Sequence, residues 1–152
     1  MPMEHSPAQN SVRYRVGPSS IENENASQEQ TPASSIERAP LHWWRTRKPQ
    51  DFDDRHVKAI RTALLRTEII DDSDWLRAVT GEPATAIGVA LKALKVLGMN
   101  DPVIDAVVSA VLCCALEGDP AARVLILSAL SRRKKIDPRC HKLKLLWRRA
   151  RF

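Results

Sequence analysis

The chain has 152 residues and a formal net charge of +6, with 43% hydrophobic and 28% charged residues. This length predicts one domain that can bury a core without disulfides or a structural metal. Only five glycines are present, which argues against glycine-rich phosphate loops and against a turn-rich β-sandwich. The composition therefore predicts a globular helical domain with a polar appendage.

We expect the appendage to be a disordered N-terminal arm, residues 1–45, followed by a helical domain, residues 46–152. The first 40 residues are rich in Ser, Glu, Gln, Asn and Pro, so they bury too little apolar surface to offset the entropy of ordering. Segment 12–16 alternates like a strand but has no partner strand nearby. No stretch here resembles a signal peptide, and the longest uncharged run, of 11 residues, cannot span a bilayer. We expect a cytoplasmic protein.

The first half of the domain is predicted to form three helices. The first begins near residues 51–54 and runs to about Ile69, with apolar side chains recurring at a period of 3.6. A short second helix carries Trp75 and closes at Gly81, and a third begins at Pro83 and ends at Gly98.

The second half is marked by the dipeptide Asp-Pro, which occurs three times at a spacing of 18 residues. Aspartate is a strong helix N-cap, and proline at the next position loses no hydrogen bond because its N–H would be unpaired there. The repeats predict helices that begin at Pro102, Pro120 and Pro138 and end near Glu117, Lys134 and Arg149.

The helix that follows Pro102 is apolar on nearly every side, with Asp105, Ser109 and Glu117 as its polar residues. A helix of this kind lies at the centre of a domain. The fold class that we predict is therefore all-α, a compact array of five or six short helices preceded by a disordered N-terminal arm.

Metal-binding and catalytic residues are not predicted. Cys113 and Cys114 are adjacent on a helix, where they point about 100° apart and cannot readily share a zinc ion with Cys140 and His141. We interpret the cysteines as reduced core thiols. Walker, Rossmann and nucleophile-elbow motifs are absent from the sequence. We expect no cofactor, no metal and no enzymatic activity.

A helix-turn-helix is worth weighing between Ser73 and Leu94. The spacing suits one, but Glu82 stands where an apolar turn residue is expected. The start of the second helix, residues 84–88, also lacks Arg, Lys, Asn or Gln to read base edges. Sequence-specific binding through this unit is therefore disfavoured.

The strongest functional signal is charge, because residues 119–152 carry 11 Lys or Arg and two Asp. Part of this excess complements helix dipoles or forms a solvated end. The rest predicts a patch that grips backbone phosphates of DNA or RNA without reading sequence. The predicted nucleic-acid-binding residues are Arg132, Arg133, Lys134, Lys135, Lys142, Lys144, Arg148, Arg149 and Arg151.

Trp43 and Trp44 stand beside three cations in residues 41–49. They could stack on bases, or fold back onto the helices as large aromatics often do. The leading function is a small non-enzymatic nucleic-acid-binding or regulatory protein. The alternative is a protein-interaction adaptor or inhibitor, in which the arm with Trp43 and Trp44 binds a partner and the basic end meets an acidic protein surface. Peripheral membrane contact is disfavoured because the apolar side of the last helix suits the core.

Overall fold

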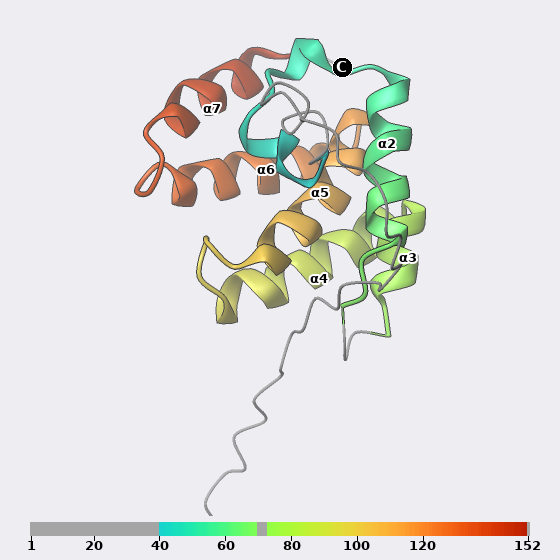
Figure 1. Ribbon diagram of the computed structural model, residues 1–152. Helices are drawn as coiled ribbons and strands as arrows, with labels where there is room; N and C mark the ends of the chain where they lie inside the picture. Colours follow the sequence, from blue (N-terminus) through green and yellow to red (C-terminus); the bar gives the residue numbers. More distant parts are fainter. Residues whose placement is uncertain (1–39, 70–72, 152) are drawn as a thin grey trace, which may run out of the picture.

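The computed structural model describes residues 40–69 and 73–151, and in these residues it confirms the predicted all-α class (Figure 1). Two short 3-10 helices precede six α-helices. Their bounds are η1 Pro40–Arg45, η2 Pro49–Asp51, α2 Asp54–Leu65, α3 Trp75–Thr80, α4 Pro83–Val96, α5 Pro102–Leu116, α6 Pro120–Arg133 and α7 Arg139–Arg149.

The predicted arm falls into two parts. Residues 1–39, including segment 12–16, lie outside the described residues. Residues 40–45 form η1, which packs on α5 and belongs to the hydrophobic core of the helical domain. The ordered domain therefore includes the six residues before the expected boundary at residue 46.

Helix α5 is the centre of the domain. It contacts α2, α3, α4, α6 and η1, and all of its residues except Pro102, Asp105 and Leu116 are buried. Figure 1 shows α5 running between α4 and α6, with α2 on the opposite side from α7. This burial confirms the predicted central position of the helix, because a helix surrounded by other elements requires apolar side chains on nearly every side.

Two of the three Asp-Pro pairs act as the repeat predicts, with aspartate as N-cap and proline as the first residue of α5 and of α6, whereas α7 begins at Arg139, one residue later than predicted. The carboxylates of Asp101 and Asp119 accept from the backbone N–H groups of Val103 (2.9 Å) and Ala122 (2.7 Å). Asp137 accepts from the N–H of Arg139 at 3.1 Å. Each aspartate thus satisfies a backbone donor that has no partner within its own helix.

Two helices end earlier than the sequence predicts. Helix α2 stops at Leu65 rather than near Ile69, because the carbonyl oxygen of Thr67 accepts from the indole N–H of Trp75 at 2.8 Å instead of continuing the helix. Helix α4 stops at Val96, where the next residue, Leu97, is already extended. Gly98 is therefore not the residue that ends α4.

Helix α7 lies at one edge of the molecule and packs on α6 (Figure 1). It buries Cys140, Leu143 and Trp147. Its last turn is held by Arg123 of α6, whose guanidinium donates to the carbonyl oxygens of Trp147 (2.8 Å), Arg148 (3.1 Å) and Ala150. A cation at a helix C-terminus satisfies carbonyls that lack helical partners and complements the dipole. The contacts of Arg123 therefore fix the end of α7, with its exposed basic residues, relative to α6.

Replacing Leu112 with alanine tests the central position of α5. Leu112 is fully buried, so Leu112→Ala should lower the free energy of unfolding by about 2–5 kcal/mol through lost burial and the cavity left behind. Leu91 of α4 is 47% exposed, and Leu91→Ala is the matched control that should cost much less. Urea unfolding measures both. A loss at Leu112 as small as that at Leu91 would contradict the buried position.

Glycine-to-alanine variants test the contacts of Gly81 in the turn after α3, with two other glycines for comparison. Gly81 and Gly118 have φ of +102° and +98°, so alanine at either is strained by about 1 kcal/mol. At Gly81 a Cβ would also lie 2.6 Å from the Arg61 guanidinium, which bonds the Thr80 carbonyl and Glu117. We expect Gly81→Ala to cost more than Gly118→Ala in thermal unfolding.

Gly88 is the control for the same series, since it lies inside α4 with open space around its Cβ position. Gly88→Ala should stabilise the protein by roughly 0.5–1 kcal/mol, the usual gain inside a helix. Equal losses at Gly81 and Gly118 would show that the contacts of Arg61 contribute nothing to stability.

Candidate nucleic-acid interface

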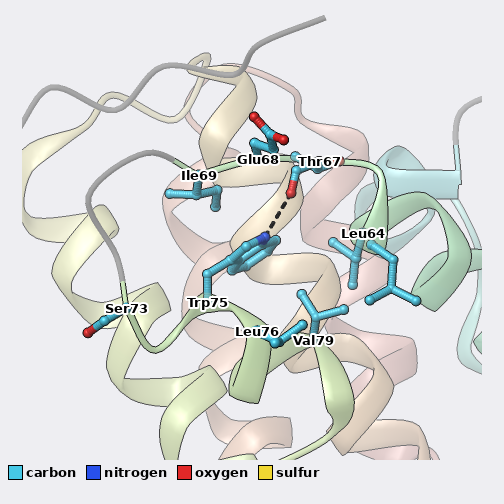
Figure 2. Close-up of a pocket in the computed structure, with 9 residues that line it drawn as sticks. Leu64, Thr67, Glu68, Ile69, Ser73, Trp75, Leu76 and Val79 are labelled. Carbon is cyan, nitrogen blue, oxygen red and sulfur yellow. Dashed lines mark hydrogen bonds between the residues drawn. The ribbon is translucent and has the colours of Figure 1, made fainter. Parts of the chain in front are cut away.

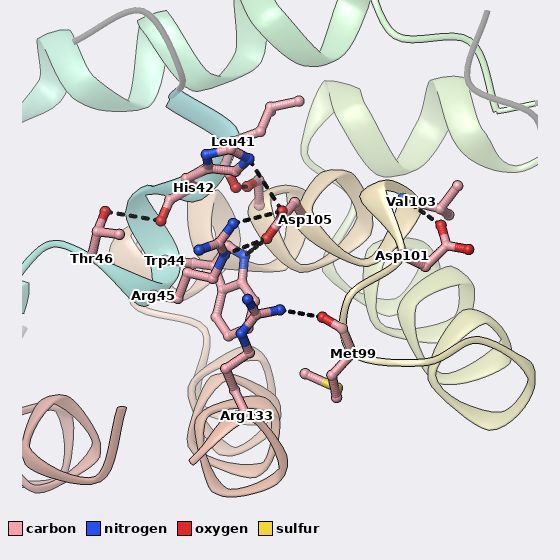
Figure 3. Close-up of polar contacts among 11 residues, drawn as sticks. Leu41, His42, Trp44, Arg45, Thr46, Met99, Asp101, Val103, Asp105 and Arg133 are labelled. Atoms are coloured by element: carbon pink, nitrogen blue, oxygen red, sulfur yellow. Dashed lines mark hydrogen bonds and ion pairs between the residues drawn. The ribbon is translucent and has the colours of Figure 1, made fainter. Parts of the chain in front are cut away.

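The segment that begins at Pro40 is held on α5 by the two polar residues of that helix (Figure 3). Asp105 accepts from the indole N–H of Trp44 at 2.8 Å. It also accepts from Nε and Nη2 of Arg45 at 2.8 and 3.0 Å, and this pairing raises the pKa of Arg45. His42 lies 3.2 Å from the same carboxylate.

One turn along α5, the Ser109 hydroxyl donates to the Leu41 carbonyl at 2.9 Å. These bonds fix the backbone and the direction of residues 41–45.

Both tryptophans of this segment lie inside the core. Trp44 is fully buried and Trp43 is 7% exposed. The ring of Trp43 packs edge-on against His56, and the Arg47 guanidinium lies 4.6 Å from its centroid. The interpretation that a tryptophan folds back onto the helices therefore describes both residues. A base or a partner protein could reach the indoles only if the segment left α5.

A basic cleft of about 360 Å³ lies between this segment and α7. Its cationic lining comes from two parts of the chain that are remote in sequence. Residues after Trp44 supply one wall and α7 supplies the other. The residues that line the basic cleft are Arg45, Thr46, Lys48, Arg139, Lys142, Leu143 and Leu146.

The four cations of the basic cleft differ in their pairing. Arg45 is bound by Asp105 as described above, and Arg139 pairs with both oxygens of Asp137 at 3.0 Å. The Arg139 guanidinium holds the pKa of Asp137 below its usual range, so that carboxylate stays ionised. Within the described residues, Lys48 and Lys142 form no ion pair and both are exposed. The positive charge left uncompensated at the cleft thus belongs to these two lysines.

Two of the nine predicted phosphate-binding cations are engaged within the fold. Arg132 donates to the carbonyl oxygen of Leu94 at 3.0 Å, and Arg133 donates to that of Met99 (Figure 3). These two arginines therefore hold the α4–α5 connection against α6. The other seven are exposed or partly exposed and lie on α7, in the turn before it or, for Arg151, just after it. They are Lys134, Lys135, Lys142, Lys144, Arg148, Arg149 and Arg151.

Only Lys142 among the nine predicted cations lines the basic cleft. The cations of residues 41–49 were predicted to form a separate contact, and Arg139 was not among the predicted residues. One feature of the sequence could have indicated that residues 41–49 pack on the helical domain. Asp105 and Ser109 are polar and lie four residues apart on one face of an apolar helix. Such a pair requires polar partners, and the nearest unassigned donors were those beside Trp44.

A second pocket, of about 390 Å³, lies between the end of α2 and α3 (Figure 2). Leucine, isoleucine, valine and the ring of Trp75 line it, and Glu68 is the one charged residue among its described lining. The exposed Leu65 and Leu76 stand at its rim. The described lining includes no lysine or arginine to bind a phosphate, so this pocket is not part of the candidate interface.

The three cysteines lie in the core. Cys113, Cys114 and Cys140 are buried and unpaired as disulfides. Burial raises the pKa of Cys113 to about 12 and that of Cys114 to about 11, so both thiols are protonated at neutral pH. A protonated thiol is a poor nucleophile and a poor metal ligand. Over residues 40–69 and 73–151, no group of three or more His, Cys, Asp or Glu side chains is placed to hold a metal ion.

The helix pair α3 and α4 covers the region weighed as a helix-turn-helix. Glu82 in the turn is paired with Arg77, whose guanidinium donates to both carboxylate oxygens at 2.8 and 2.6 Å. The exposed start of α4 presents Pro83, Ala84 and Thr85. None of these side chains makes the bidentate contacts by which proteins read bases.

No family model, curated protein or solved structure matches this chain. In the part of the chain that the structure describes, every helix is too short or too polar to cross a membrane.

Removing the Asp105 carboxylate should detach the first segment from α5. Asp105→Ala leaves Arg45 and the Trp44 indole without their acceptor in a nearly buried site, which should cost about 3 kcal/mol of unfolding free energy. Asp51→Ala, at an exposed position, should change it by no more than about 0.5 kcal/mol. Urea unfolding followed by tryptophan fluorescence measures both. If the two variants unfold alike, these contacts do not hold the segment.

Proposed function

We propose that this protein binds nucleic acid through the backbone phosphates, without reading sequence, and that it is not an enzyme. The observation that carries the proposal is the basic cleft, where cations from residues 45–48 and from α7 surround one concave site. Phosphate groups are the anions for which such cation clusters provide most of the binding energy in protein–nucleic acid complexes.

The surface around the basic cleft supports the same proposal. Residues 132–151 contain ten lysines and arginines and one aspartate. Lys134, Lys135, Arg148 and Arg149 are exposed, and Arg149 lies seven residues after Lys142, on the same side of α7. A phosphate backbone that enters the cleft would therefore meet further cations along that helix.

The adaptor alternative has less support. It depends on Trp43 and Trp44 as exposed anchors, whereas both are buried against α2 and α5. The basic surface could also meet an acidic protein, because complementary charge alone does not separate that partner from a nucleic acid. Nothing in the geometry of the cleft favours a protein surface over phosphate groups.

Fluorescence anisotropy with labelled random duplex DNA and single-stranded RNA tests the proposal. We expect binding at about 50 mM salt that weakens at 200 mM, by roughly 3.5-fold for each duplex phosphate contacted, because counterions are released on binding. The variant that replaces Lys134 and Lys135 with glutamine should weaken binding on every sequence and reduce the salt dependence by about one contact per lysine.

The matched control replaces Lys58 and Lys95, which are exposed on α2 and α4, with glutamine. It removes the same charge from other faces and should affect binding much less. Arg132 and Arg133 are left intact in both variants. Because both bind backbone carbonyls, replacing them would change the stability of the fold as well as the charge. Absence of binding at the lower salt would contradict the proposal.

A further inference from the structure

The charge of the basic cleft suits an anion with two negative charges. Its two arginines are each paired with an aspartate, and neither Asp105 nor Asp137 lines the cleft. Its two lysines, one on each wall, have no such partner among the described residues. The uncompensated charge is that of two ammonium groups, each of which donates hydrogen bonds to any accepting oxygen within reach.

Phosphate groups within a nucleic acid strand are diesters and carry one negative charge each. A phosphate at the end of a strand is a monoester, which carries about −1.5 to −2 at pH 7 and has three strong acceptor oxygens. Two lysines that line one cleft compensate the monoester more fully than a single diester. On this charge count, a phosphate at the end of a strand fits the cleft better than a single interior phosphate.

The remaining lining of the cleft suits the nucleotide that carries such a phosphate. Leu143 and Leu146 add apolar surface to the α7 wall of the cleft. The hydroxyl of Thr46 is held at the cleft by its hydrogen bond to the His42 carbonyl, at 2.9 Å, and its oxygen can still accept. A volume of about 360 Å³ lies in the range of small-ligand sites, larger than a lone phosphate requires.

From this geometry we infer that the basic cleft binds the terminal phosphate monoester of a nucleic acid strand. The inference rests on the proposed function and names the part of the nucleic acid that the cleft recognises. Interior phosphates bind along the exposed cations of α7 and the turn before it. The cleft then adds a preference for strands that end in a phosphate.

The test compares oligonucleotides of one sequence that carry a 5′-phosphate, a 3′-phosphate or hydroxyl groups at both ends. Anisotropy is measured with the full-length protein at about 100 mM salt, where surface charges more than about 10 Å apart are largely screened. At least one phosphorylated end should bind about tenfold more tightly than the hydroxyl form, as expected for one added charge-assisted hydrogen bond. Inorganic phosphate at millimolar concentration should compete for that preference and leave the remaining binding unchanged.

Two variants locate the preference. Lys48→Ala and Lys142→Ala should each bring the dissociation constants for the hydroxyl and phosphorylated oligonucleotides to nearly the same value. The melting temperature should not change, because both lysines are exposed and unpaired. Lys135→Ala, on the turn between α6 and α7 and outside the cleft, is the control. It should weaken the binding of all oligonucleotides and keep the ratio.

Equal affinity for phosphorylated and hydroxyl ends would overturn the inference and leave the proposed function standing. A preference that survives both Lys48→Ala and Lys142→Ala would overturn its location in the cleft. Failure of every oligonucleotide to bind would overturn the proposed function and the inference with it. Binding of inorganic phosphate alone, with no oligonucleotide bound, would assign the cleft to a small phosphate compound and overturn the strand end as its ligand.

Discussion

The carboxylate of Asp105 accepts from Trp44 and Arg45 and lies beside His42, and these contacts determine where the chain before α2 runs. Asp105 and Ser109 are polar positions on a helix that is otherwise apolar and buried. A polar group in such surroundings is costly unless it is hydrogen-bonded, so it requires a polar partner from another element. The segment from Pro40 provides that partner and in doing so completes one wall of the basic cleft.

Arginine has a second structural role at the ends of the helices. Arg123 binds the last carbonyls of α7, Arg132 binds a carbonyl in the last turn of α4, and Arg133 binds one in the turn that follows. Backbone carbonyls at helix ends lack helical partners, and a guanidinium can donate to several of them. A count of basic residues therefore overstates the charge available to a ligand, since part of it is used within the fold.

The basic cleft illustrates how a site can arise from elements that the sequence keeps apart. Lys48 follows η1, whereas Lys142 lies in the last helix, and the two share a cleft because α5 positions η1 and α6 positions α7. The exposed lysines contribute little to stability themselves. Their placement depends on buried groups elsewhere, above all Asp105 for one wall and Trp147 with Arg123 for the other.

The sequence by itself determined the helices, because their signals are local. Asp101 and Asp119 cap α5 and α6, Asp137 binds the first N–H of α7, and the apolar surroundings of α5 place it at the centre. Tertiary structure decided which residue ends α2. It also decided that Trp43 and Trp44 lie in the core, and which cations bind carbonyls or carboxylates. Those outcomes depend on acceptors that lie far away along the chain, and local periodicity carries no information about partners at such separations.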